Sequence, residues 1–321
     1  MSVFKERISS KNLEGQLIDT HTHSGGMDLS NFFNGRYPSN QDILDLNEKR
    51  IRNGVGFQIV YPMQTSIYYD ITTYWKLREF LPSGYSEYPF QLENRYLLLQ
   101  IRYFSLERML PFVGFSLQDK VIEQESDILR LAKDYSIYGL KYHTKIDQKS
   151  ADKVDKESDF VEIAKHLNIP ITFHTEQKGV SSAISVLELA SRYPEVRFCA
   201  AHFGGFSADF FRELDKYPYD NLYFDTCPLL PRCHYLSNNR SSELLDLDYE
   251  NPRSILKYFA EHYPDRVLWG TDSPWTNYGP LDEYHKNLSE FGYCQEVEII
   301  KTSGYHEMMT QNTIRYLFGG E

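Results

Sequence analysis

Four short apolar runs of the chain each end in side chains that can bind a metal ion, and this pattern is the strongest constraint on the fold. His21 and His23 follow the first run, and because side chains alternate along a β-strand, residues two apart project from the same face. Three later runs end in further potential ligands, which are His174, His202 and Asp272. Strand ends that bring such side chains to one point predict the mouth of a β-barrel.

The rest of the chain alternates β-rich runs with helical patterns, which predicts a parallel sheet with crossover helices. The predicted strands are residues 16–21, 56–61, 111–117, 138–143, 170–174, 196–202, 221–225 and 266–271. The predicted helices are residues 39–53, capped by Ser39, 158–167, 181–192, 207–216, 252–262 and 306–317. Eight such units in 321 residues predict an α/β fold, a single (β/α)8 TIM barrel over residues 1–321, with its active site at the carboxyl ends of the strands.

Two predicted connections are too long to be simple turns. The segment 62–110 follows the second strand and is rich in aromatic residues, and long connections in compact domains are usually functional covers or disordered. We therefore expect it to form a partly helical lid over the barrel mouth. The segment 226–251 follows the seventh strand and is predicted to be a polar loop.

The composition excludes several classes of partner. A net charge of −11 argues against a nucleic-acid partner, because binding to phosphates requires clustered Lys and Arg. No apolar run approaches the roughly 20 residues that span a bilayer, and no signal peptide follows Met1. The four cysteines show no metal-binding or redox spacing. These observations predict a cytoplasmic protein with reduced thiols and no membrane partner.

The candidate ligands suit one divalent ion, and zinc fits them best. A catalytic zinc site offers about three protein ligands plus a water, drawn from imidazole and carboxylate groups. His21, His23, His174 and Asp272 supply three imidazoles and one carboxylate, and His202 adds a fourth imidazole nearby. Zinc lowers the pKa of its water to roughly 7, and a carboxylate beside it can take and return the proton. Asp272 suits that role.

These residues stand within motifs that resemble the amidohydrolase superfamily, and more closely its amidohydrolase-2 branch. This branch comprises metal-dependent barrel hydrolases and decarboxylases related to aminocarboxymuconate semialdehyde decarboxylase. The matching motifs are Ile18-Asp19-Thr20-His21-Thr22-His23, Gly139-Leu140-Lys141-Tyr142-His143, Ile171-Thr172-Phe173-His174-Thr175-Glu176, Ala201-His202-Phe203-Gly204-Gly205, Tyr223-Phe224-Asp225-Thr226, Gly270-Thr271-Asp272-Ser273-Pro274, and Asn312 with Leu317-Phe318-Gly319. They cover nearly the whole chain outside the two long connections.

The resemblance implies a role for each site residue. His21, His23, His174 and Asp272 would bind one zinc ion, and His202 would polarise the substrate or position the water. In binuclear relatives a carboxylated lysine bridges two metals, so Lys141 is an alternative ligand in a two-metal site.

The remaining candidates are neighbours of these motifs. Residues expected to contact the substrate are His143, Glu176, Trp275, Arg36 and Tyr142. Asp225 is a further candidate for contacting the substrate or a metal ligand, whereas Cys227 is interpreted as a packing residue. The histidines expected on the solvated surface are His166, His234, His262, His285 and His306.

Three functions remain open at this point. The leading hypothesis is hydrolysis of an ester, lactone or amide bond of a small organic substrate, with Asp272 as the acid and base and with the metal and His202 polarising the scissile carbonyl. The second is non-oxidative decarboxylation of an aromatic or unsaturated acid, which needs a cation such as Arg36 or Arg232 to hold a carboxylate. The third is a non-catalytic barrel that binds a ligand. A homodimer is the default expectation for the assembly.

Overall fold

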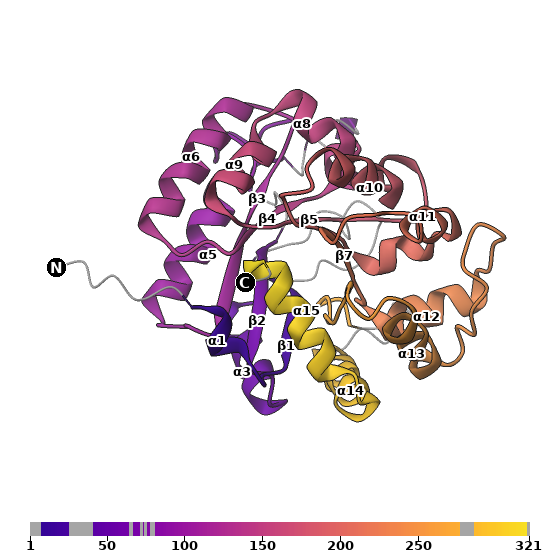
Figure 1. Ribbon diagram of the computed structural model, residues 1–321. Coiled ribbons are helices and arrows are strands. Elements are labelled where there is room, and N and C mark those ends of the chain that lie inside the picture. The colour runs from indigo at the N-terminus through magenta and orange to yellow at the C-terminus, as the bar shows by residue number, and fades with distance from the viewer. Residues whose placement is uncertain are drawn as a thin grey trace.

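Eight parallel strands follow one another in chain order in the part of the chain that the structure describes, and they form a nearly closed barrel (Figure 1). The structure is a computed structural model that describes residues 8–25, 41–63, 67–70, 73, 76–77, 81–276 and 286–319, without the side chains of 286–291. The strands are β1 (Ile18–Ser24), β2 (Phe57–Pro62), β3 (Met109–Phe115), β4 (Gly139–Tyr142), β5 (Ile171–Phe173), β6 (Phe198–Ala200), β7 (Leu222–Asp225) and β8 (Val267–Leu268). The predicted (β/α)8 barrel is confirmed.

The residues after β8 close the barrel against β1. The backbone N–H of Thr20 donates to the carbonyl of Trp269 over 2.9 Å, and the N–H of Asp272 donates to the carbonyl of His21 over 2.8 Å. These bonds fix the first and last strand ends side by side, so two candidate ligands that are 251 positions apart in the chain become neighbours.

Helices surround the barrel, as Figure 1 shows. They are α1 (Ser10–Leu13), α3 (Ile43–Arg52), α5 (Gln91–Tyr103), α6 (Val121–Asp134), α7 (Thr144–Asp147), α8 (Val154–Glu157), α9 (Phe160–Leu167), α10 (Ala183–Arg192), α11 (Ala208–Leu214), α12 (Leu229–Asn238), α13 (Pro252–His262), α14 (Lys286–Ser303) and α15 (His306–Phe318). The predicted helix 39–53 starts later than expected. Asp42 caps α3 by accepting a hydrogen bond from the N–H of Leu44. Ser39, the predicted cap, lies outside the described residues.

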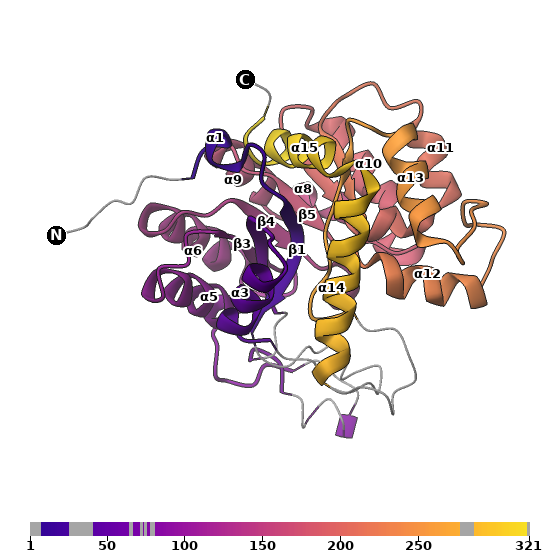
Figure 2. The same ribbon diagram turned by 90° about the horizontal axis from the view of Figure 1, so that it is seen from below.

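One end of the barrel is sealed by hydrophobic residues. Leu13 of α1 packs with Ile314 and Leu317 of α15 and with the first residues of the strands, such as Ile18. Figure 2 shows α1 and α15 together at this end. The open end is therefore the one where the strands finish, and it is the end where barrel enzymes place their chemistry.

The segment 62–110 is only partly what the sequence predicted. Its helix, α5, lies between α3 and α6 in the outer ring and contacts β2 and β3, so it is the ordinary crossover helix rather than a cover. The described residues Tyr68 and Tyr69 are buried against Ile146, and the Tyr68 hydroxyl donates to Asp119 over 2.5 Å. Asp119 follows β3 and Ile146 follows β4, so both lie at the carboxyl ends of the strands. A lid over the barrel mouth would cover this end. The lid itself stays a prediction.

The prediction for 226–251 was wrong in one respect. This segment contains α12, a helix of 10 residues. Its sequence, Leu-Leu-Pro-Arg-Cys-His-Tyr-Leu-Ser-Asn, has a proline and a polar end that weaken the helical signal. The helix is stabilised from outside: a carboxylate oxygen of the buried Glu296 accepts the N–H of Leu230 over 2.7 Å, which satisfies a donor in its first turn.

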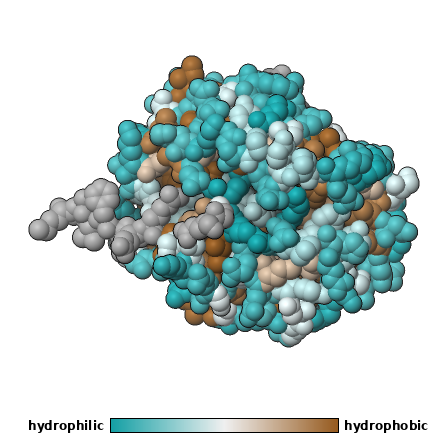
Figure 3. Space-filling view, viewed as in Figure 1, coloured by the Kyte–Doolittle hydropathy of each residue, from teal (hydrophilic) through white to brown (hydrophobic). Residues whose placement is uncertain are grey.

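Of the helices that the structure describes, none combines the length and the apolar character that crossing a bilayer requires. On the face seen in Figure 3, hydrophobic residues are interrupted by hydrophilic ones.

Candidate active site

Three potential metal ligands form a small triangle at the open end of the barrel. His21 and His23 project from the same face of β1, with their Nε2 atoms 3.1 Å apart. Asp272 follows β8, and its Oδ1 lies 3.5 Å from Nε2 of His21 and 3.4 Å from Nε2 of His23. Two ligand atoms of one tetrahedral zinc ion, each about 2.1 Å from the metal, stand about 3.4 Å apart. The three donor atoms therefore have the spacing that a shared ion requires.

A second cluster, formed by His21, Asp225 and Cys227, also has ligand-type atoms close together. Its distances are shorter: His21 Nδ1 is 2.7 Å from Asp225 Oδ2, and Cys227 Sγ is 3.0 Å from Asp225 Oδ1. Such separations are hydrogen bonds rather than the edges of a coordination shell. The imidazole of His21 thus donates Nδ1–H to Asp225 and leaves the lone pair of Nε2 for a metal, an arrangement typical of metal-binding histidines.

His202 begins a left-handed turn after β6. Five consecutive residues, from His202 to Phe206, have φ between 55° and 70°, a region that costs most non-glycine residues energy. The N–H of His202 donates to Asp225 Oδ1 over 2.7 Å, and its Nδ1 is 2.8 Å from the carbonyl of Cys227. The turn therefore directs the His202 ring into the barrel mouth, 5.0 Å from the ring of His21.

Gly205 makes this turn possible, and we expect Gly205→Ala to destabilise the protein. Its φ is +70°, and a Cβ there would lie 2.2 Å from the carbonyl carbon of Glu176. Gly179 is a matched control, because its φ is +75° but a Cβ would meet nothing within 4 Å. Thermal unfolding should show a loss of about 1 kcal/mol for Gly179→Ala and of about 3 kcal/mol for Gly205→Ala. Equal losses would contradict the steric argument.

His174 belongs to a row of imidazoles and is partly exposed, whereas His21 and His202 are buried. Its Nδ1 is 3.0 Å from Nε2 of His202, its Nε2 is 3.6 Å from Oε1 of Glu176, and its ring stacks on that of His143 with centroids 4.0 Å apart. Glu176 in turn pairs with Lys145 over 2.7 Å. The nearest polar partner of the His174 ring is thus His202, which, like His23, lies within ligand reach of both His21 and Asp272.

Lys141 is buried at the centre of the site. Its Nζ lies 3.3 Å from Nε2 of His21 and 4.5 Å from the centre of the Tyr61 ring. Burial lowers the pKa of this amine below its usual value of 10.5, while the carboxylates of Asp225 and Asp272 oppose the shift. An amine with a weakened hold on its proton can act as a ligand or be modified.

Four imidazoles of the site bind a proton more weakly than a free histidine does. Burial is the largest cause that lowers the pKa of each well below 6.5, and nearby cations and imidazoles lower it further; these residues are His21, His143, His174 and His202. Burial also raises the pKa of Asp272 to about 8, against the charge of Lys141. Neutral imidazoles keep lone pairs for a metal, and an added cation would favour the ionised carboxylate.

The structure brings some predicted substrate-contacting residues to the site and not others. Trp275 packs edge-on against the ring of His23, with centroids 4.7 Å apart. Tyr142 does not reach the site: it is fully buried between the strands and the outer helices, where it stacks on Phe115. It lies on the face of β4 opposite to Lys141, so this structure does not bring it to the clustered histidines. Arg36 lies outside the described residues.

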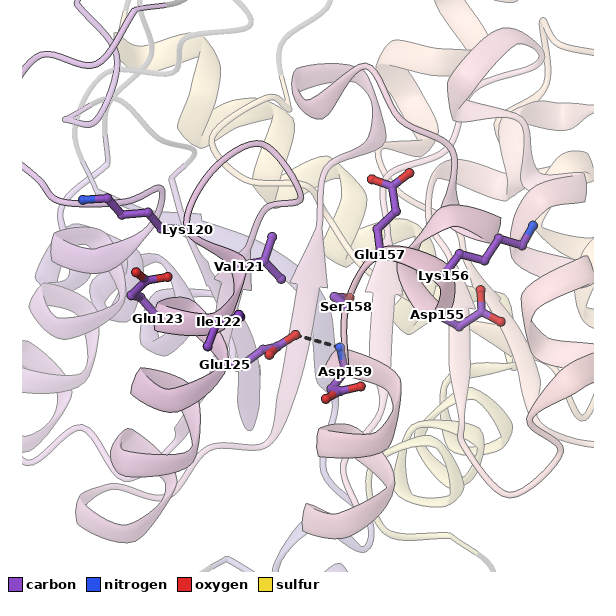
Figure 4. Close-up of a pocket in the computed structure, with 10 residues that line it drawn as sticks. All are labelled: Lys120, Val121, Ile122, Glu123, Glu125, Asp155, Lys156, Glu157, Ser158 and Asp159. Atoms are coloured by element: carbon purple, nitrogen blue, oxygen red, sulfur yellow. Dashed lines mark hydrogen bonds between the residues drawn. The ribbon is translucent and has the colours of Figure 1, made fainter.

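A groove of about 530 Å³ lies outside this cluster, between the start of α6 and the junction of α8 and α9 (Figure 4). Its walls carry five carboxylates and two lysines. One carboxylate, that of Glu125, accepts the N–H of Asp159, the residue just before α9, over 2.7 Å. Asp155 pairs with Arg192, and Glu157 pairs with Lys149. These charged groups of the groove are thus paired with other residues of the outer ring. None of the clustered histidines lines the groove, so it is separate from the candidate active site.

Comparison with known proteins agrees with this geometry. A family model described as amidohydrolase matches residues 87–297, which is more than half of the chain. None of the curated protein sequences matches.

Solved structures with the same fold cover nearly the whole chain. A probable 2-pyrone-4,6-dicarboxylic acid hydrolase from Acinetobacter baumannii, with citric acid bound, shares 14% identity over 95% of this chain and 100% of its own, with a TM-score of 0.58. An amidohydrolase from Burkholderia multivorans with bound zinc shares 12% identity over 96% and 100%, with a TM-score of 0.58. IDCase from Metarhizium anisopliae, in its apo form, shares 12% identity over 97% and 98%, with a TM-score of 0.56.

Proposed function

Because the chain belongs to the amidohydrolase family, we propose that it is a metal-dependent hydrolase that cleaves an ester, lactone or amide bond of a small organic substrate. The observation that supports this most is the triangle of donor atoms from His21, His23 and Asp272, with edges of 3.1, 3.4 and 3.5 Å. His174 completes the proposed set of ligands, and zinc is the proposed ion, since neutral imidazoles and one carboxylate suit it.

The residues present fit such an ion. Asp225 holds the proton of His21 on Nδ1, so the nitrogen that faces the triangle carries a lone pair. A bound zinc ion would supply Lewis acidity and lower the pKa of a water. The carboxylate of Asp272 faces the two histidines with Oδ1 and lies 3.9 Å from Nδ1 of His202 with Oδ2. One oxygen is thus available to the metal and the other to a proton.

The chain's own groups then move and hold protons. Asp272 Oδ2 takes a proton from the attacking water and returns it to the leaving group. His202 uses its Nδ1–H on the carbonyl of Cys227, so its neutral ring offers only a lone pair at Nε2. That lone pair lies 3.0 Å from Nδ1 of His174; it can accept an N–H or an O–H, but it cannot donate to the substrate carbonyl. Of the two roles implied for His202, positioning the water is therefore the one we propose.

His143 is proposed to bind the substrate. Its Nδ1 accepts the N–H of Ile146 over 3.2 Å, so the neutral ring carries its proton on Nε2 and can donate to an oxygen of the substrate. Trp275 and Glu176 are also proposed to line the substrate site. Trp275 forms an aromatic wall beside His23, and Glu176 is held in place by its ion pair with Lys145.

A substrate screen tests the function. The chain is stripped with a chelator, reloaded with zinc and assayed against lactones, esters, amides and phenolic acids, with release of acid and of CO₂ recorded separately. Hydrolysis that returns with zinc would support the proposal. Release of CO₂ without hydrolysis would instead favour decarboxylation of an aromatic or unsaturated acid on the same residues, since fold and metal do not fix the reaction.

We expect one divalent ion per chain when the protein is purified without chelator. The reason is that one triangle of donor atoms has the spacing of a shared ion. Elemental analysis measures the ratio, and mass spectrometry of the peptide that contains Lys141 detects carboxylation. A ratio near two with a modified Lys141 would replace the one-metal proposal with the bridged two-metal alternative.

A further inference from the structure

The segment from Asp225 to Cys227, at the end of β7, contacts both histidines that face each other across the site. The carboxylate of Asp225 accepts Nδ1–H of His21 over 2.7 Å through Oδ2, and the backbone N–H of His202 over 2.7 Å through Oδ1. The carbonyl of Cys227 lies 2.8 Å from Nδ1 of His202. All four residues are buried, so these partners do not compete with bulk water.

The contacts determine which ring nitrogen of each histidine carries the proton. A carbonyl oxygen can only accept, so Nδ1 of His202 must be the donor. Nδ1 of His21 faces a carboxylate and donates in the same way. A neutral imidazole has one proton, so Nε2 carries a lone pair in both rings. The two lone pairs are directed away from this segment: Nε2 of His21 faces His23, and Nε2 of His202 faces His174.

The thiol of Cys227 has a defined partner as well. Its Sγ lies 3.0 Å from Oδ1 of Asp225, which is short for a thiol donor. Cys199 lies on the other side of the same carboxylate, with Sγ 4.0 Å from Oδ2, at the limit of any hydrogen bond. Both thiols are buried. They therefore differ in hydrogen bonding to Asp225 while sharing burial and side-chain volume.

The thiol of Cys227 shares its carboxylate partner with His202, a residue whose backbone is strained. His202 has φ of 61°, and its N–H donates to the same Oδ1 that Cys227 contacts. A residue in this region persists only when its surroundings hold it. Asp225 and Cys227 supply that hold from the neighbouring strand end, and packing alone does not require a thiol aimed at a carboxylate.

We propose that Cys227 is a positioning residue: its S–H fixes the carboxylate of Asp225 and its carbonyl fixes the ring of His202, so that His21 and His202 both present an unprotonated Nε2 to the site. This role rests on the metal site proposed above and adds a residue that the sequence suggested only for packing. It predicts that the loss of one buried thiol weakens metal binding, although that thiol is not a ligand.

The first readout is the zinc dissociation constant, measured by competition with a chelator. Partners of metal ligands typically contribute 10–100-fold in affinity, so Asp225→Asn should weaken binding by about 10–100-fold and Cys227→Ala by about tenfold. Cys227→Ser keeps a donor and should stay within about twofold of the wild type, as should Cys199→Ala, the matched control. Thermal unfolding of each chain separates these effects from a general loss of stability.

The second readout is the protonation of the histidine rings, from ring nitrogen NMR spectra of the metal-free chain. The wild type should show Nδ1–H for His21 and His202. Asp225→Asn places an amide against the rings and should move the proton of His21 to Nε2. This measurement does not depend on zinc, so a wild-type chain that bound no metal would refute the metal site while the spectra still tested the positioning role.

The proposal is overturned if Cys227→Ala matches Cys199→Ala in both readouts, or if the wild-type spectra show a proton on Nε2 of His21. Should the Cys227→Ala chain not fold, Cys227→Val fills the volume without a donor and takes its place, with the same expected result. Recovery of affinity in Cys227→Ser, but not in Cys227→Val, would support hydrogen bonding over packing.

Discussion

Replacing Asp272 with Asn should lower turnover about 100-fold or more, the usual contribution of a positioned acid or base, while most of the bound metal is retained. Asn has nearly the same shape and keeps an oxygen that can face His21 and His23, which lie 3.5 and 3.4 Å from Oδ1 of Asp272. It has no basic oxygen to receive the proton of the water.

The measurement compares turnover of a substrate found by the screen with zinc content of the same preparation. Asp127→Asn is the matched control, because Asp127 is a buried carboxylate on α6 that pairs with Arg95 and Arg130 far from the cluster. It should leave turnover unchanged. Near-normal turnover of Asp272→Asn, together with complete loss in His202→Asn, would move the proton-transfer role to His202.

The sequence predicted the barrel well because parallel buried strands leave a clear signal. Each predicted strand overlaps an observed one, and the predicted helix 252–262 coincides with α13. Runs that are apolar on both faces and alternate with amphipathic helices fit few other folds. The helix α12 was missed because the partner that stabilises it is distant in the chain. Glu296 supports α12 from 66 positions away, and no local pattern reveals such a contact.

The site was predictable where strand geometry alone decides the direction of a side chain. The two-residue spacing of His21 and His23 places both on one face, and it does the same for Lys141 and His143. The same rule puts Tyr142 on the opposite face, so the expected contact of Tyr142 with substrate conflicted with the spacing of its neighbours. Its burial against Phe115 shows the consequence.

Asp225 and Cys227 illustrate what the sequence could not provide. Asp225 ends β7 and stands in one of the matching motifs, and Cys227 follows it, but neither signal says which side chains they contact. Their partners, His21 and His202, come from other strands, and contacts of 2.7 to 3.0 Å depend on the register of the barrel rather than on the residues alone. A side chain at a strand end can bind a metal, a substrate or another side chain, and only the structure distinguishes these.

Replacing His21 with Asn should abolish zinc binding and turnover while the fold survives. The amide nitrogen of Asn occupies nearly the position of Nδ1 in a histidine, so Asn can still donate to Asp225, which His21 contacts over 2.7 Å through that atom. What is lost is Nε2, the atom 3.1 Å from His23. Loss of a ligand should weaken zinc binding by more than the 10–100-fold that is typical of a ligand's partner, so we expect a decrease of more than about 100-fold.

His202→Asn is the variant to compare with His21→Asn, because it makes the same substitution at the neighbouring ring, 5.0 Å from that of His21. Asn can keep the donor to the carbonyl of Cys227, 2.8 Å from Nδ1 in the native chain, and it loses the Nε2 that we propose holds the water. Turnover should therefore fall in both chains, but zinc content should fall much further in His21→Asn. Zinc analysis and turnover of the two chains, prepared in parallel, measure this. Equal zinc content would mean that the triangle of His21, His23 and Asp272 is not the metal site, because only one of the two substitutions removes a corner of it.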